Sequence, residues 1–166
     1  MSHCRIGIDP GASGAIVILD AAGVPLKWAA MPTRKTGSAT RVNAAALAAL
    51  LRPFANGLAF LEQVGAMPGQ GVSSMFSFGH SAGVVSGVLG ALEIETTMVT
   101  PQAWKRRAGL IGTDKDAARS RAIELWPAWR ELDAKGRGQA LADAALIARF
   151  GEAVTARGAQ HTGGAA

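Results

Sequence analysis

The segment RIGIDPGASGA at residues 5–15 constrains the fold of this chain more than any other stretch. An apolar run ends on Asp9, the chain turns through Pro and Gly residues, and a second apolar run covers residues 15–19. This pattern predicts a β-hairpin whose first strand delivers Asp9 to the end of a sheet. A carboxylate in that position is costly unless a metal ion or a proton donor stabilises it. The hairpin therefore raises the question of which other residues meet Asp9.

The remaining pattern predicts a mixed α/β sheet with helices packed on it. Apolar runs between turn residues predict further strands at residues 25–31, 58–62 and 95–100. Helical spacing of apolar residues predicts helices at residues 41–54, 74–92, 114–125 and 139–150, with a short helix beginning at Pro101. We expect Asn43 and Thr113 to cap two of these helices. Residues 32–40 are polar and are expected to form a loop.

Length and composition favour a single domain with a substantial core. Of 166 residues, 49% are apolar, which excludes a disordered chain. We expect the domain to cover residues 1–152 and the Gly- and Ala-rich residues 153–166 to form a disordered tail. The longest apolar stretch, residues 81–92, falls short of the roughly 18 residues that a membrane span needs. No secretion signal is visible and Cys4 is alone, so we expect a cytoplasmic location without membrane association.

Three of the twelve acidic residues do not sit where solvent would explain them. Asp9 and Glu62 end apolar strands, and Asp143 lies in an Ala-rich helix on the face that should be buried. If that helix crosses the two strands, the three carboxylates converge, and each charge raises the pKa values of the others. Divalent cations that prefer oxygen ligands, Mg²⁺ or Mn²⁺, would resolve this repulsion.

The net charge of +5 and the excess of Arg over Lys suggest a polyanionic partner. The densest cation cluster is expected on the short helix, at Lys105, Arg106 and Arg107, and on the next helix, which begins near Lys115. Such a cluster is typical of a surface that contacts nucleic-acid phosphates. An ordinary solvated helix face is the alternative reading of the same charges.

Several motifs in this order resemble those of the RuvC-type Holliday junction resolvases, which belong to the ribonuclease H-like superfamily. The strand-end acids in GIDPG and LEQV, and the Ala-Asp-Ala run of the final helix, carry the resemblance. The runs MPGQGVSSMFSFG, VTPQAWKRRAGL and GTDKD are also similar to segments of the compact bacterial and phage RuvC-like proteins. The resemblance spans residues 5–150.

This resemblance implies a ribonuclease H-like fold with a five-stranded sheet in the order 3-2-1-4-5 and helices on both faces. It implies a magnesium-dependent endodeoxyribonuclease that acts as a homodimer and resolves four-way DNA junctions by paired nicking. Asp9, Glu62 and Asp143 would be the catalytic metal ligands, holding two Mg²⁺ ions that Mn²⁺ could replace. Lys105 and Lys115 match basic positions that contact phosphates in the family.

Two further features fit this resemblance. Phe76 follows the Gly-rich loop that leaves the Glu62 strand, and it is a candidate wedge at the crossover of a junction. The same ring could instead anchor the start of its helix. Gly79, Gly83 and Gly87 recur every four residues and form a flat row, which suits close packing on the sheet or across a dimer axis.

The chain departs from the family pattern at one position. A fourth acid usually precedes the helix Asp by three or four residues, but Gln139 and Ala140 stand there. Gln139 offers a neutral oxygen, and Asp133 could reach in from the preceding loop. The departure keeps open a non-catalytic or weakly active module that binds junctions or branched DNA.

Two other functions share features with this sequence. A ribonuclease H that cleaves RNA–DNA hybrids would use the same metal chemistry. The DPGASG turn also resembles the phosphate hairpin of sugar kinases and actin-like ATPases, but those proteins need two such domains and this chain is too short.

Overall fold

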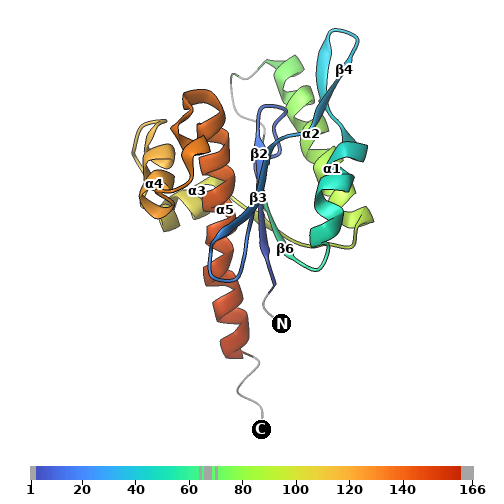
Figure 1. Cartoon of the computed structure of the whole chain (residues 1–166). Helices are drawn as coiled ribbons and strands as arrows, with labels where there is room; N and C mark the ends of the chain where they lie inside the picture. Colours follow the sequence, from blue (N-terminus) through green and yellow to red (C-terminus); the bar gives the residue numbers. More distant parts are fainter. Residues whose placement is uncertain (1–2, 64, 66–68, 70, 162–166) are drawn as a thin grey trace.

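The computed structural model of this chain describes residues 3–63, 65, 69 and 71–161. Its centre is a five-stranded mixed sheet (Figure 1). The strands are β1 (Arg5–Ile8), β2 (Ala15–Leu19), β3 (Pro25–Ala30), β6 (Leu58–Glu62) and β7 (Glu95–Val99). β1, β2 and β3 form an antiparallel meander, whereas β6 and β7 run parallel to β1.

The sheet order is β3-β2-β1-β6-β7, so the five predicted strands stand in the predicted order 3-2-1-4-5 and only the numbering of the last two differs. Two unexpected strands, β4 (Thr33–Thr36) and β5 (Ala39–Val42), lie between β3 and β6 in the sequence. They pair only with each other and form a separate two-stranded sheet. The loop expected at residues 32–40 is therefore a β-ribbon.

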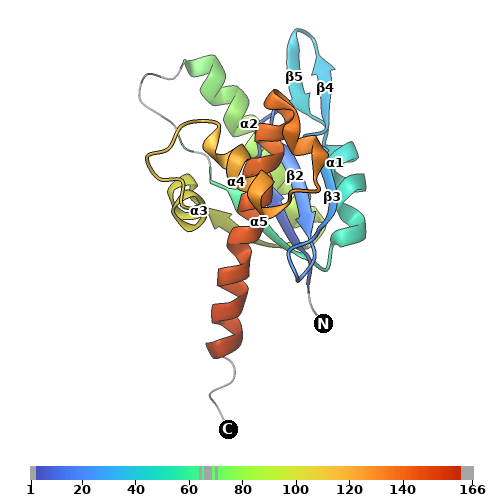
Figure 2. The same ribbon diagram turned by 60° about the vertical axis from the view of Figure 1, so that its left-hand side comes forward.

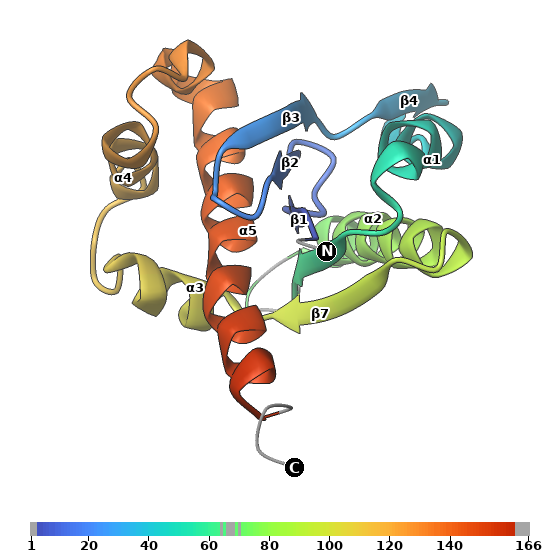
Figure 3. The same cartoon turned by 60° about the horizontal axis from the view of Figure 1, so that its bottom comes forward.

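Helices cover both faces of the sheet, as predicted (Figure 3). On one face, α1 (Ala44–Leu51) and α2 (Val72–Ala91) pack through Leu47, Val85 and Leu89 against Ile6 and Ile8 of β1. On the opposite face lies the long α5, Lys135–His161. The shorter α3 (Pro101–Ala108) and α4 (Ala117–Leu125) flank α5 (Figures 1 and 3).

Alternation along the strands explains this arrangement. Ile16 and Ile18 of β2 point to the α1–α2 side, whereas Ala15, Val17 and Leu19 point to α5. Because successive side chains of a strand face opposite sides, a strand that is apolar at every position has both faces covered. All five residues of β2 are buried.

The helix ends agree only partly with the sequence-based prediction. The Asn43 side chain accepts a hydrogen bond from the Ala46 amide (3.2 Å), which confirms the predicted cap of α1. Thr113 does not cap α4, because the Asp114 carboxylate accepts the amides of Asp116 and Ala117 (both 3.0 Å). This local turn competes with the helix, so α4 begins at Ala117.

The last helix is longer than predicted. α5 begins at Lys135 and continues to His161, so residues 153–161 are helical rather than part of the expected disordered tail. Residues 162–166 lie outside the described residues, as does part of the loop expected at residues 65–74. Within the described ranges, no helix is both long and apolar enough to span a membrane.

One contact brings α5 directly onto the sheet. A Cβ atom added at Gly7 of β1 would overlap the Ala144 carbonyl oxygen and the Ala148 amide nitrogen of α5. Ala144, Ala145 and Ala148 are fully buried there. Glycine on the strand and alanine on the helix therefore allow the two backbones to touch, which is the close approach that the Ala-rich sequence predicts.

Candidate active site

Asp9 lies one residue after β1, in the turn that leads to β2. Its Oδ1 accepts a hydrogen bond from the Gly11 amide (3.3 Å), and its own amide donates to the Ala15 carbonyl (3.1 Å). A Cβ atom at Gly14 would overlap the Asp9 carbonyl oxygen, so only glycine lets the turn close at that point. The turn thus fixes the Asp9 carboxylate at the sheet edge.

Glu62 is brought beside Asp9 by the parallel pairing of β1 and β6. Ile8 pairs with Leu61 in this register, so the two acids follow at the same edge of the sheet. The indole Nε1–H of Trp104, on α3, donates a hydrogen bond of 2.8 Å to Glu62 Oε1. Trp104 is only 1% exposed, so the core holds the ring that orients this carboxylate.

Asp143 reaches the same edge from α5. The contact between Gly7 and Ala144 sets the helix against β1, and Asp143 directly precedes Ala144. The Gln139 side-chain amide, one turn earlier, donates a hydrogen bond of 3.1 Å to Asp143 Oδ1. First strand, fourth sheet strand and last helix therefore each supply one acid, as the sequence predicts.

The electrostatics show that the three carboxylates interact. Burial raises the pKa of Asp9, and the Gly11 amide opposes that rise. Burial also raises the pKa of Glu62, and the charge of Asp9 adds to that rise. The hydrogen bond from Trp104 and the charge of Lys105 act in the opposite direction. The largest effect is on Asp143, where burial, followed by the charges of Asp9 and Glu62, raises the pKa to about 7.

The donor set suits a hard divalent cation, because carboxylate oxygens are the ligands that Mg²⁺ and Mn²⁺ prefer. Within the described residues, however, no group of three or more His, Cys, Asp or Glu side chains is arranged to hold a metal ion as it stands. The charges of Asp9 and Glu62 raise the pKa of Asp143, so the three carboxylates belong to one electrostatic site.

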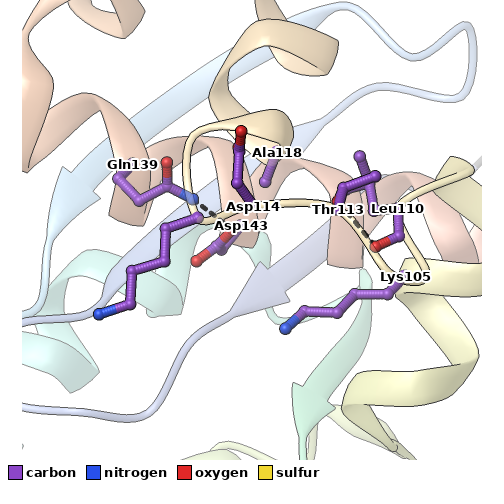
Figure 4. Close-up of a pocket in the computed structure, with 8 residues that line it drawn as sticks. Lys105, Leu110, Thr113, Asp114, Ala118, Gln139 and Asp143 are labelled. Atoms are coloured by element: carbon purple, nitrogen blue, oxygen red, sulfur yellow. Dashed lines mark hydrogen bonds between the residues drawn. The ribbon is translucent and has the colours of Figure 1, made fainter.

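A cavity of about 280 Å³ opens beside Asp143 (Figure 4). Lys105 of α3 and Lys115 of the α3–α4 connection line it together with Asp143 and Gln139. Thr113 and Asp114 complete its polar wall, and the Thr113 hydroxyl donates to the Leu110 carbonyl (2.8 Å). Two lysines and two aspartates therefore line one cavity beside Asp143.

The other predicted nucleic-acid contacts do not all lie at this cavity. Arg106 and Arg107 are exposed on α3, and Arg107 lines a different cavity with Arg121 and Arg149. Phe76 lies on α2 and is 65% exposed, so it is not buried as a helix anchor. Lys115 precedes α4 instead of belonging to it.

Gln139 stands where the family pattern has a fourth acid, and its side chain lies against Asp143. Its Oε1 atom is buried and has no hydrogen-bond partner within the described part of the chain. Asp133 does not reach the site, because its Oδ2 pairs with Arg130 Nε at 3.3 Å on the surface. Gln139, and not Asp133, is therefore the residue of this region that hydrogen-bonds to Asp143.

Sequence patterns did not connect Trp104 with the candidate site. The ring is part of the core, but its N–H reaches the candidate site. The signal was available: Trp104 lies on the helix that follows β7, which is the neighbour of the strand that ends on Glu62. A buried indole needs a hydrogen-bond acceptor, and the strand-end carboxylate was the nearest candidate.

The chain is an α/β protein whose mixed sheet and last helix bring three acids together. No protein-family model matches the chain, and no curated protein sequence matches it. Among solved structures, that of Thermus thermophilus RuvC is similar with a TM-score of 0.54 and 16% sequence identity. The alignment covers 90% of this chain and 92% of that chain, so the similarity extends over the whole fold.

Proposed function

We propose that this protein is a metal-dependent endonuclease that resolves four-way DNA junctions. The observation that carries the proposal is the meeting of Asp9, Glu62 and Asp143 beside a cavity lined by Lys105 and Lys115. The likeness of the fold to that of Thermus thermophilus RuvC supports the choice of a junction as substrate, together with the motif resemblance seen in the sequence.

In this proposal, the three carboxylates hold Mg²⁺, with Mn²⁺ as a substitute and two ions for each site. Bound ions would supply charge stabilisation to a phosphodiester and activate water for its hydrolysis. Trp104 keeps Glu62 in one orientation through its indole N–H. Lys105 and Lys115 place ammonium groups at the cavity, where they can hold a phosphate oxygen of the DNA strand.

A homodimer is part of the proposal, and the glycine row of α2 supports it. Cβ atoms added at Gly79, Gly83 and Gly87 would meet nothing within 4 Å among the residues that the structure describes. The row therefore does not pack on the sheet of its own domain, which was one of the two uses expected for it. A second copy of the chain could approach α2 closely along this row.

Cleavage of a mobile four-way junction tests the function directly. The protein is incubated with the junction, a linear duplex and an RNA–DNA hybrid in Mg²⁺ or Mn²⁺. Paired, symmetrical nicks confined to the junction are expected, and Asp9→Asn should abolish them. Asp133→Asn is the matched control, because it removes a surface carboxylate paired with Arg130 and should leave cleavage unchanged. Cleavage of the hybrid alone would assign a ribonuclease H activity instead.

One observation favours a second candidate, a module that binds branched DNA without cutting it. Gln139, a neutral side chain hydrogen-bonded to Asp143, stands where the family pattern has a fourth acid. Junction binding that persists in Asp9→Asn, with no cleavage by the unaltered chain in either metal, would select this candidate. Hydrolysis of ATP would contradict both.

A further inference from the structure

The β4–β5 ribbon stands out from the body of the molecule beside the first turns of α2 (Figures 1 and 2). All four residues of β4 are exposed. The ribbon pairs with no strand of the main sheet, so it adds nothing to the central core except Val42 at its base. The ribbon buries so little apolar surface that it contributes little to the stability of the fold, which suggests that it serves in binding.

The charge of the ribbon is all of one sign. Residues 33–42 contain Arg34, Lys35 and Arg41 and no acid. Arg34 and Arg41 are direct cross-strand partners, so they lie on the same face of the ribbon. Like charges directly opposite one another destabilise an antiparallel pair, and a bound anion removes that cost.

Arg41 links this face to α2. Its Nη1 donates a hydrogen bond of 2.9 Å to the Ser77 hydroxyl, and its guanidinium lies 5.5 Å from the centre of the Phe76 ring. Phe76 remains 65% exposed despite this contact. The ribbon is therefore held in a fixed position, with Arg34 on the same face as Arg41 and with an exposed aromatic ring at its foot.

A polar surface continues from the foot of the ribbon to the candidate active site. A cavity of about 310 Å³ lies there, lined by Ala12, Phe78 and the three serines Ser74, Ser77 and Ser81. Ala12 belongs to the Asp9 turn, and a Cβ atom at Gly11 would lie 3.2 Å from the Phe78 ring. Hydroxyl groups thus connect the Asp9 turn with Arg41, and cations continue outward from there.

We propose that the β4–β5 ribbon contacts the phosphate backbone of a duplex DNA arm that leads away from the candidate active site. This inference rests on the proposed function. A two-stranded ribbon has the width that a DNA major groove admits, and Arg and Lys are the side chains that contact phosphates most often. The contacts carry affinity without sequence preference, because the ribbon presents mainly cations and hydroxyls.

Salt dependence of binding tests the ribbon. Affinity for a labelled four-way junction is measured by fluorescence anisotropy at several salt concentrations, with Asp9→Asn in every chain to prevent cleavage. The double variant Arg34→Ala/Lys35→Ala removes the cation from each face of β4 and should lose about one to two units of slope in log K against log salt, since each phosphate contact contributes roughly 0.9. Both residues are exposed, so circular dichroism should remain that of the unaltered fold.

The double variant Lys27→Ala/Arg52→Ala is the matched control. It removes the same charge from exposed positions on β3 and on the 3₁₀ turn Arg52–Phe54, away from the ribbon. An unchanged slope in this control, with the loss confined to the ribbon variant, supports the proposal. An equal loss in both variants would show a net-charge effect and overturn it.

The outcomes separate the ribbon from the proposed function. If the chain with an intact ribbon binds the junction and the ribbon variant keeps its full slope, the ribbon proposal fails and the function stands. If the chain with an intact ribbon does not bind branched DNA, both fail. Loss of binding to poly-glutamate with unchanged DNA binding would assign the ribbon to an acidic polypeptide and overturn the proposal.

Discussion

Trp104 is a buried core residue whose indole N–H also donates a hydrogen bond to the candidate site. Its ring fills the space between β7, α3 and α5, and its N–H stabilises the Glu62 carboxylate. Lys105, the next residue, lies with its Nζ 5.4 Å from the centre of the same ring. Packing, orientation of an acid and placement of a cation therefore depend on one side chain.

Trp104→Phe should both destabilise the protein and raise the Mg²⁺ concentration needed for cleavage. Loss of the indole N–H leaves Glu62 without its donor, and we expect a destabilisation of about 1–3 kcal/mol. Denaturant unfolding and cleavage rates over a Mg²⁺ series measure the two effects. The orientation of Glu62 is the physical reason for the second effect.

Trp126→Phe provides the control for this change. The Trp126 indole N–H donates to the Gly23 carbonyl at 2.8 Å, away from the acids. Its loss should lower stability to a similar extent and leave the Mg²⁺ requirement unchanged. A shift of the same size in both variants would mean that Trp104 acts through stability alone.

Among the elements, α2 is divided between a packed and an open face. Ser81, Val85 and Leu89 are buried against the sheet, whereas the glycines at 79, 83 and 87 are exposed. Glycine is a poor helix former by about 1 kcal/mol relative to alanine. Three such residues on an otherwise open face are explained if a partner helix needs the space.

Gly83→Leu should therefore convert a dimer into monomers without unfolding the chain. A Cβ atom added at this position meets no atom within 4 Å in the described part of the chain, so the fold should tolerate a leucine side chain there. Sedimentation velocity reports the oligomeric state, and thermal unfolding reports the fold.

Gly136→Leu is the comparable change in α5, where a Cβ atom also meets nothing within 4 Å. It should leave the oligomeric state unaltered. An unaltered chain that sediments as a monomer at all concentrations would contradict the homodimer.

The elements that sequence patterns predicted best are those with two packed faces. The strands 5–8, 15–19 and 58–62 are nearly continuous apolar runs, and the structure confirms them. The β4–β5 ribbon was missed because TRKT and ATRV bury almost nothing, so no apolar alternation marks them. The Gly37-Ser38 pair was the available sign of a tight turn between two strands, and Gly37 adopts a φ of 60° there.

At the scale of the molecule, the candidate site joins residues from the two ends of the described chain. Sequence patterns could identify the three acids, because each interrupts an apolar context. They could not give the separation of the carboxylates, which depends on how deeply α5 settles on Gly7 and on how Trp104 and Gln139 turn two of them. The relative placement of the three carboxylates was therefore beyond prediction from sequence.

The stability of the whole fold should fall as the pH rises towards 8 in the absence of divalent cations. The pKa of Asp143 is raised from 3.8 to about 7, so ionising it costs free energy in the folded state that it does not cost in the unfolded state. Stability from the protonated group is complete below about pH 4 and is lost as the pH passes through 7.

Asp143→Asn should remove this loss. At about pH 8 in EDTA, we expect the variant to be more stable than the unaltered protein by about 1–3 kcal/mol, given 1.36 kcal/mol for each pKa unit and partial relaxation of the site. At about pH 4 the gain should vanish. Urea unfolding at the two pH values measures it, with Asp133→Asn as a control whose effect is small at both.

The same unfolding measurement in the presence of Mg²⁺ tests whether Asp143 takes part in binding the cation. The cation should stabilise the unaltered protein at about pH 8, because binding to the folded state alone raises stability by mass action. The Asn variant should gain much less. Equal stabilisation of both chains would place any Mg²⁺ binding elsewhere on the molecule.

The candidate site is completed late in protein synthesis, because α5, which packs on Gly7, is the last element of the chain that the structure describes. The ribosome releases β1 and β6 long before α5, so Asp9 and Glu62 emerge well ahead of Asp143. A nascent chain or a fragment broken before α5 carries two of the three acids and lacks the helix that covers one face of its sheet. Under the proposed function, the complete set of three acids is present only once the last helix has been made.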